Sequence, residues 1–167
     1  SESAVSLGVL SKTYGLAGLR IGWAATRNRK VLARMAELKD YTTICNSAPS
    51  ELLAEIALRH RAKLAARNVG LMTHHLALLD EFFARRAHQF AWSRPQAGPI
   101  GFPCLIPPES GAPRWPDADA FCEQAVSRAG VLLLPGSVFG DYPQHFRVGF
   151  GRKNLPEALA QLDAYLD

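Results

Sequence analysis

Two basic side chains stand where chemistry explains them better than solubility does. Lys12 follows the apolar run Val5–Leu10, and Arg20 comes eight residues later, beyond a turn that contains Gly15 and Gly18. A lysine that is partly withdrawn from water, with a cation nearby, has a lowered pKa and forms imines with carbonyl compounds. The planar guanidinium of arginine binds phosphate or carboxylate through paired hydrogen bonds. The pair therefore predicts carbonyl chemistry beside a bound anion.

Ser11 and Arg147 extend this pattern. Ser11 adds a hydroxyl donor directly before Lys12, and Arg147 lies in the alternating segment Phe146–Phe150, on the face opposite the apolar residues. An arginine in an apolar strand is costly to bury without an anion. Two simpler explanations stay open, since Lys12 can merely end a strand and either arginine can pair with a carboxylate of the protein.

Strands and helices alternate along the chain and would position these residues. Apolar residues alternate in some segments and recur at helical spacing in others. The predicted strands are 5–10, which we expect to be buried, 19–23, 90–92, 100–106, 131–134 and 146–150. The predicted helices are 28–39, 49–67, 69–88, one that is capped near Asp117, and one that runs from Asn154 to about 166. This order predicts an α/β protein with two parts, residues 1–70 and 71–167.

Composition excludes several classes of protein. The 167 residues are 48% hydrophobic and 20% charged, which is typical of a globular domain and not of a disordered chain. No apolar run approaches the roughly 18 residues of a membrane span. The net charge of +4 is small and spread among helical segments, so we expect neither nucleic-acid nor membrane binding. The N-terminal residues do not resemble a secretory signal, and we expect a cytoplasmic protein.

Histidine and cysteine spacing predicts no metal site. His74 and His75 are adjacent on a predicted helix and point in different directions, without a third ligand at suitable spacing. We expect them to be surface or core residues. The three cysteines match neither a disulfide framework nor a CxxC pair, which fits a reducing compartment.

Three segments carry a resemblance to a known family. Residues Ser11–Trp23 resemble the pyridoxal-phosphate attachment signature of class I/II aminotransferases of fold type I, with a lysine, glycines at set offsets and an arginine eight residues on. Leu134–Gly140 and Phe146–Gly151 resemble the C-terminal blocks of the same family, in the right order. The resemblance covers nearly the whole chain. It implies an α/β, three-layer aminotransferase-like fold, here the end of the large domain followed by the small domain.

The resemblance also implies a role for each residue. Lys12 would attach pyridoxal 5′-phosphate and move a proton at the substrate α-carbon, while Ser11 and Arg20 would hold the cofactor phosphate. Arg147 would bind the substrate α-carboxylate. Tyr14 and Asn46 fall in segments that lie near the active site, or near that of a partner subunit, in relatives.

Two departures from the family pattern affect the expected site. Val9 stands where many relatives have Ser or Gly, so a hydroxyl to the phosphate is missing and Arg20 matters more. Only 11 residues precede Lys12, whereas relatives have a long region there that supplies further cofactor contacts. We therefore expect a C-terminal part of an aminotransferase, which by itself binds the cofactor weakly and is inactive.

The resulting prediction is a pyridoxal-phosphate-dependent aminotransferase that moves an amino group from an amino acid to a 2-oxo acid. The full-length protein is expected to be a homodimer. Two alternatives remain. The first is a decarboxylase or lyase of the same fold, because the cofactor serves several reactions at the α-carbon. The second is a non-catalytic fragment that dimerises or binds a partner.

Overall fold

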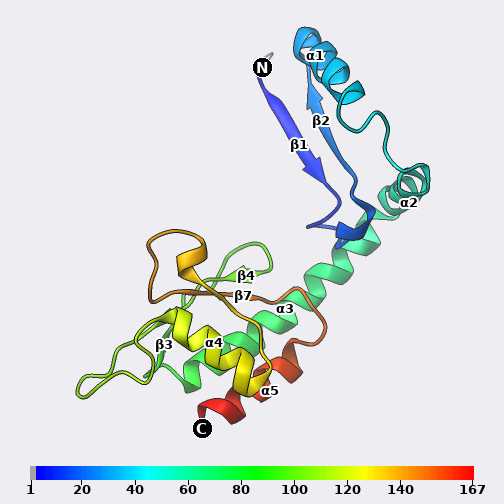
Figure 1. Ribbon diagram of the computed structural model, residues 1–167. Coiled ribbons are helices and arrows are strands. Elements are labelled where there is room, and N and C mark those ends of the chain that lie inside the picture. The colour runs from blue at the N-terminus through cyan, green and yellow to red at the C-terminus, as the bar shows by residue number, and fades with distance from the viewer. Residues whose placement is uncertain (1–2) are drawn as a thin grey trace. The chain divides into compact units, whose positions relative to one another are not determined.

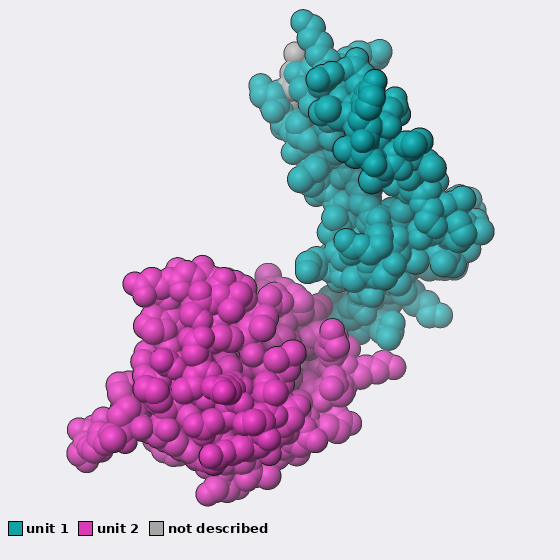
Figure 2. Space-filling view, in the orientation of Figure 1, with its two compact units in different colours: residues 1–69 teal, residues 70–167 magenta. Residues whose placement is uncertain are grey.

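A computed structural model describes residues 3–167. The chain forms two compact units, residues 1–69 and 70–167, shown in teal and magenta in Figure 2. Strands and helices occur in both units, so the protein is mixed α/β (Figure 1). Within the described residues, no helix is both long enough and apolar enough to span a membrane.

A two-stranded hairpin forms the first unit's sheet. Strand β1 (Val5–Val9) pairs antiparallel with β2 (Gly22–Thr26), in a register that places Gly8 opposite Trp23. The Trp23 ring lies over Gly8 so closely that a Cβ there would fall 2.3 Å from ring carbon Cε2. A side chain at position 8 would therefore displace the Trp23 ring from its place across the strand pair.

The second strand begins later than the sequence predicted. The alternation in residues 19–23 indicated a strand with Arg20 in it, and that prediction is wrong. A 3-10 helix, η1 (Ala17–Leu19), occupies its start, and Arg20 follows in the left-handed conformation with φ of 55°. An alternating pattern that extends over only five residues does not distinguish a strand from a turn that leads into one.

The expectation that β1 is buried is also wrong. Leu7 is 78% exposed and Trp23 is 46% exposed, whereas Leu10, just after the strand, is fully buried. The faces of a two-stranded sheet are buried only where other parts of a protein pack on them. The apolar side chains of β1 are therefore exposed in the described chain.

Three helices follow, called α1 (Arg29–Asp40), α2 (Ala48–Arg59) and α3 (Arg61–Arg85). Asn28 caps α1, because its side-chain oxygen accepts from the N–H groups of Lys30 and Val31. The predicted break between the second and third helices, near residue 68, is wrong. The break lies at His60, and α3 continues through Gly70 because packing in the second unit outweighs the low helix propensity of glycine.

The second unit contains two small antiparallel sheets. One pairs β3 (Phe90–Ala91) with β5 (Cys104–Leu105), and the other has the order β4-β7-β6. The latter strands are β4 (Ile100–Gly101), β7 (Phe146–Gly149) and β6 (Leu134–Pro135). The predicted strand over 100–106 is split, because Pro103 has no N–H for a ladder. The predicted strand over 131–134 is paired only from Leu134 on.

Helices α3, α4 (Ala118–Ala129) and α5 (Leu155–Leu166) pack with these strands around one aromatic core. Phe82, Phe90, Phe121 and Phe146 are each at most 2% exposed. Full burial of one such side chain stabilises the fold by about 1.5–3 kcal/mol. Asp117 caps α4 by accepting from the Ala120 N–H at 2.8 Å, as predicted.

The Cys122 thiol belongs to this core. Burial raises its pKa to about 12, and the Asp119 carboxylate acts in the same direction. The thiol therefore stays neutral at physiological pH, which fits a packing role and not that of a nucleophile.

Candidate functional site

Backbone hydrogen bonds fix the turn that carries Lys12. The Gly15 N–H donates to the Lys12 carbonyl at 3.1 Å, and the Leu16 N–H donates to the Leu10 carbonyl at 3.0 Å. Gly15 has a φ of 69°, which a side chain would strain. The glycine in this segment therefore serves the turn and holds Lys12 just beyond the end of β1.

The Lys12 side chain is exposed. The partial desolvation considered from the sequence is absent, because β1 is itself an exposed strand. Its amine is accessible to a carbonyl compound. Its neighbour Ser11 is half-buried, so the two adjacent side chains lie in different surroundings.

Asn68 of α3 holds the same turn from outside. Its Nδ2 donates to the Thr13 carbonyl at 3.0 Å, across 55 residues of sequence. The same amide lies 3.3 Å from the place that a Cβ on Gly15 would take. The sequence did not single out this residue, because a polar side chain on an exposed helix position carries no local signal of such a contact.

Ser11 and Arg20 line one cavity of about 150 Å³, together with Val9, Leu16, Ala17, Ile21 and Gly22. The structure thus brings together the two residues predicted to hold a phosphate. Val9, noted above as a departure from the family pattern, lines the same cavity and contributes an apolar wall. Lys12 is not part of the lining, although it is the next residue after Ser11.

Arg20 is held in an uncommon conformation, and no ion pair within residues 3–167 neutralises its charge. Its φ of 55° is rare for a residue other than glycine and costs on the order of 1–3 kcal/mol. Its Nη1 donates to the Ala17 carbonyl at 3.1 Å, and no carboxylate among residues 3–167 pairs with it. The alternative of an ion pair within the protein therefore finds no support for Arg20 in the described chain.

A phosphate group fits this cavity chemically. Phosphate oxygens accept hydrogen bonds, and the lining supplies a hydroxyl and a guanidinium that keeps donors free. Backbone strain of the kind seen at Arg20 concentrates at sites that bind ligands. The accessible Lys12 amine next to Ser11 adds a group that reacts with an aldehyde. These residues suit a phosphorylated aldehyde.

Tyr14 and Asn46 lie outside this cavity. Tyr14 is half-buried in the Lys12 turn. The Asn46 amide donates to Glu51 at 2.8 Å, and its oxygen accepts from Lys39 at 3.3 Å. The side chain of Asn46 is therefore engaged in the loop before α2.

Arg147 lies in the second unit, in the middle of β7, opposite Leu134 of β6. Its neighbours Phe146 and Val148 face the core, at 1% and 6% exposure, so the predicted division of faces is confirmed. The Arg147 guanidinium carbon lies 5.8 Å from the centroid of the Phe139 ring. Phe139 lies in the motif Leu134–Gly140 described above, but its contact with Arg147 was not predicted.

Arg147 also lines a cavity of about 510 Å³, with Arg152 and Glu157 at the start of α5 among the other lining residues. Throughout the part of the chain that the structure describes, no carboxylate forms an ion pair with Arg147. The second simpler explanation, an internal ion pair, thus finds no support at Arg147 either. The guanidinium is left free to bind an anion from outside the chain.

The turn before β7 is built around Gly136. Its N–H donates to the His145 carbonyl at 2.7 Å, and a Cβ at this position would lie 2.2 Å from the Tyr142 carbonyl oxygen. No larger residue fits. His145 itself stacks on Phe102, with ring centroids 5.1 Å apart, so it belongs to the aromatic surroundings of this turn.

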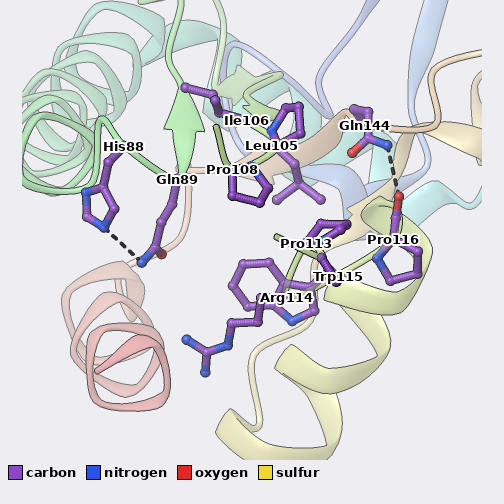
Figure 3. Close-up of a pocket in the computed structure, with 12 residues that line it drawn as sticks. His88, Gln89, Leu105, Ile106, Pro108, Pro113, Arg114, Trp115, Pro116 and Gln144 are labelled. Carbon is purple, nitrogen blue, oxygen red and sulfur yellow. Dashed lines mark hydrogen bonds between the residues drawn. The ribbon is translucent and has the colours of Figure 1, made fainter. Parts of the chain in front are cut away.

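A third cavity of about 330 Å³ contains none of the predicted site residues (Figure 3). Prolines and Trp115 form much of its wall, and Gln144 donates to the Pro116 carbonyl at 3.0 Å. Arg114 is engaged with the carbonyls of Tyr165 and Leu166 at 2.9 Å. This cavity is separate from the residues that could bind a phosphate or a carboxylate.

Comparison with known proteins identifies relatives that are similar to this chain over nearly all of its residues. The family described as aminotransferase class I and II matches residues 2–162. Capreomycidine synthase from Streptomyces vinaceus is 30% identical over 99% of this chain and 41% of its own. A pyridoxal-phosphate-dependent aminotransferase from Streptococcus suis has a TM-score of 0.85 at 31% identity, over 99% of this chain and 42% of its own.

A further solved structure, the pyridoxal-phosphate-dependent cyclase OrfR, has a TM-score of 0.82 at 33% identity, over 97% of this chain and 42% of its own. The predicted fold class, the α/β fold of these enzymes, is confirmed. The chain spans about two fifths of the length of each of these relatives.

Proposed function

Because the chain belongs to the class I and II aminotransferases, we propose that it is the C-terminal part of a pyridoxal-phosphate-dependent aminotransferase. The reaction is transfer of an amino group from an amino acid to a 2-oxo acid. Residues 1–70 would then be the end of the large domain and residues 71–167 the small domain. One observation supports this most directly, namely that Ser11, the residue directly before Lys12, lines one cavity together with Arg20.

Each site residue has a distinct task in this proposal. Arg20 and Ser11 bind the cofactor phosphate with charge-assisted and hydroxyl hydrogen bonds. Lys12 holds the cofactor covalently through its side-chain nitrogen and, when released, moves a proton to and from the substrate α-carbon. Pyridoxal phosphate, when bound, supplies an electron sink that weakens the bonds to that carbon.

Arg147 binds the α-carboxylate of the substrate in this proposal. A guanidinium that forms two parallel hydrogen bonds with the carboxylate fixes the orientation of the substrate. One bond of the α-carbon is thereby presented for reaction. Phe139 lies beneath the guanidinium and restricts its movement. Tyr14 and Asn46 are proposed to lie near the active site or near that of the partner subunit in a homodimer.

Trapping the cofactor tests the proposal. The whole protein is incubated with pyridoxal phosphate, reduced with borohydride, and digested for mass spectrometry. We expect a pyridoxyl group on Lys12, and none after Lys12→Ala. Lys30→Ala, which removes an exposed lysine of α1, is the matched control and should retain labelling at Lys12. Labelling at any other lysine would refute the assignment.

A second candidate reaction is favoured by the names of two similar proteins. Capreomycidine synthase and the cyclase OrfR are not named as aminotransferases. The same lysine, arginine and cofactor serve cyclisation, elimination or decarboxylation when the site selects another bond. Incubation of an amino acid with and without a 2-oxo acid separates the two, because only aminotransfer requires the 2-oxo acid and converts it to a new amino acid.

The isolated 167 residues are expected to bind pyridoxal phosphate weakly and to have no transaminase activity. The exposed β1 and the exposed Lys12 both indicate that the described residues cover only part of the site. Lys12-dependent turnover by the isolated chain would contradict this expectation. The remaining alternative, a non-catalytic binding fragment, would be supported if the whole protein also failed to label at Lys12.

A further inference from the structure

Helix α3 donates one side-chain hydrogen bond to each segment that carries a proposed site residue. Asn68 donates to the Thr13 carbonyl at 3.0 Å in the first unit. The His75 Nδ1 lies 2.9 Å from the Phe150 carbonyl oxygen in the second unit. Thr13 follows Lys12 directly, and Phe150 comes three residues after Arg147. Each contact joins segments that are more than 50 residues apart in sequence.

We propose that Asn68 and His75 are positioning residues. Asn68 holds the turn that carries Lys12, and His75 holds the strand that carries Arg147. The proposal rests on the roles given to Lys12 and Arg147 above. Neither Asn68 nor His75 reaches the reacting atoms in this proposal, since each acts through the backbone of its partner segment.

The Asn68 amide contacts the Lys12 turn at two points. It donates to the Thr13 carbonyl, and it packs against Gly15, whose left-handed conformation sets the direction of the turn. Within the turn, Gly15 donates to Lys12 and Leu16 donates to Leu10, and at its start the Leu10 N–H donates to the Ile21 carbonyl at 3.2 Å. Asn68 therefore anchors the turn to a long helix, and loss of this anchor frees the Lys12 backbone to move.

The His75 ring fixes the end of β7 from within the core. The side chain is 2% exposed, and a carbonyl oxygen only accepts, so Nδ1 carries the proton in this contact. The Phe150 N–H in turn donates to the Pro99 carbonyl at 2.8 Å. Both backbone polar groups of Phe150 are thus satisfied, and these two bonds hold the residue that directly follows β7, in addition to the pairing of β7 with β4 and β6.

Rotation of β7 matters because Arg147 projects from the face opposite the core. A long side chain magnifies a small rotation of its strand into a larger displacement of its charged end. Displacement of a binding group by about 1 Å is enough to lower activity up to a hundredfold. In this proposal His75 adds to the strand pairing of β7 in fixing where the guanidinium lies, although it does not touch the substrate.

A purely structural role predicts a different result from a positioning role. Loss of the His75 hydrogen bond lowers stability in both cases, because the buried Phe150 carbonyl loses its donor, whereas the Thr13 carbonyl is exposed and can bind water instead. Only positioning predicts a selective effect at a temperature where the variant is still folded. Asn68 variants should then alter cofactor capture by Lys12 alone, and His75 variants should alter carboxylate binding alone.

For Asn68, the measurements are the dissociation constant of pyridoxal phosphate and the rate of borohydride trapping at Lys12, in the whole protein. Asn68→Leu has nearly the same shape without a donor and should weaken binding about fivefold. Asn68→Gln keeps an amide donor and should recover most of this loss. Arg67→Leu, at the exposed neighbouring position on α3, is the matched control and should change neither value.

For His75, the measurement is the dissociation constant of a non-reactive carboxylate analogue of the amino acid, by calorimetry on the loaded protein. His75→Phe should weaken binding about fivefold and raise KM more than it lowers kcat. His75→Asn places its amide nitrogen where the ring has Nδ1 and should recover most of the loss. His74→Phe, at the adjacent exposed position, is the matched control. If His75→Phe does not fold, His75→Leu replaces it, because it is smaller and also lacks a donor.

Arg147→Gln and Lys12→Ala, measured in parallel, separate the two proposals. If Arg147→Gln leaves carboxylate binding unchanged, or Lys12→Ala leaves labelling unchanged, the proposed function fails. If these variants behave as expected while Asn68→Leu and His75→Phe bind as the wild type does, positioning is overturned. Equal losses of both kinds of binding in each variant would also overturn it, because that result indicates general destabilisation.

Discussion

The guanidinium carbon of Arg147 lies 5.8 Å from the centre of the Phe139 ring, so an aromatic face from the Gly136 turn supports the residue proposed to bind the substrate carboxylate. Attraction between a cation and an aromatic ring contributes about 0.5–1 kcal/mol at exposed sites. The contact leaves the donors of the guanidinium free for an anion. It therefore limits the orientations of Arg147 without occupying its hydrogen-bonding groups.

Replacement of this ring should weaken substrate binding. We expect Phe139→Leu to raise KM for the amino-acid substrate two- to fivefold, as loss of about 0.5–1 kcal/mol requires, with kcat little changed. Steady-state kinetics of the whole protein measure both values. Val138→Ala, at a 65% exposed position in the same turn, is the control and should leave KM unchanged. A kcat effect without a KM effect would contradict the role proposed for Phe139.

Removal of the Arg20 charge should weaken cofactor binding. Hydrogen bonds to a charged group contribute about 1.5–3 kcal/mol, so Arg20→Gln should raise the dissociation constant of pyridoxal phosphate by about 10- to 100-fold. Pyridoxal, which lacks the phosphate, should bind wild type and variant alike. Absorbance titration measures both ligands. Equal losses for the two ligands would indicate that Arg20 does not bind the phosphate.

Acid should remove a stabilising contribution at Asp80. Burial alone would raise the pKa of Asp80, but hydrogen bonds from Trp92 and Arg94, each 2.7 Å long, and the Arg94 charge lower it below its usual 3.8. A pKa that is lower in the folded state gives stability that is complete above the unfolded value and is lost as pH falls through the folded one. The stabilities of wild type and Asp80→Asn, measured by urea unfolding, should therefore differ at pH 7, and the difference should shrink as the pH is lowered toward 3. A constant difference over that range would contradict this assignment.

Two glycines should respond in opposite ways to alanine. At Gly136 a Cβ would lie 2.2 Å from a backbone carbonyl, so Gly136→Ala must shift the turn and should lower the free energy of unfolding by more than 1 kcal/mol. At Gly70, inside α3, a Cβ has no heavy atom within 4 Å. Gly70→Ala should raise the free energy of unfolding by about 0.5–1 kcal/mol. Denaturant titration of both variants checks the pair.

Local signals in the sequence predicted where α1 and α4 start, but not where α3 starts, and the predicted cap residue Asn154 forms no side-chain cap hydrogen bond. Asn28 and Asp117 both cap helices with a side-chain oxygen, because a short acceptor beside the first turn is sufficient for capping and needs no distant partner. The face of Arg147 in β7 was also predictable, since Phe146 and Val148 alternate with it. These features depend only on residues within a few positions of one another.

Features that depend on distant contacts were not predictable. The helix break at His60 is preceded and followed by residues that ordinarily form helices. Gly70 has a lower helix propensity and predicted a break, but packing of α3 outweighs that propensity. The left-handed backbone of Arg20 was not predictable, because residues 19–23 alternate as the residues of a strand do. The contact of Asn68 with Thr13 spans 55 residues, and nothing near either residue indicates it. The proposed site residues could thus be named from motifs, whereas the side chains that contact their segments could not.

In the proposed function, the residue that binds the cofactor phosphate, Arg20, is also one whose left-handed backbone costs stability. Glycine adopts a φ of 55° without strain, so Arg20→Gly relieves the backbone while it removes the guanidinium. A library screened only for resistance to heat would enrich this substitution, and one screened for pyridoxal phosphate binding would eliminate it. Any attempt to stabilise the protein by directed evolution must therefore select with the cofactor present.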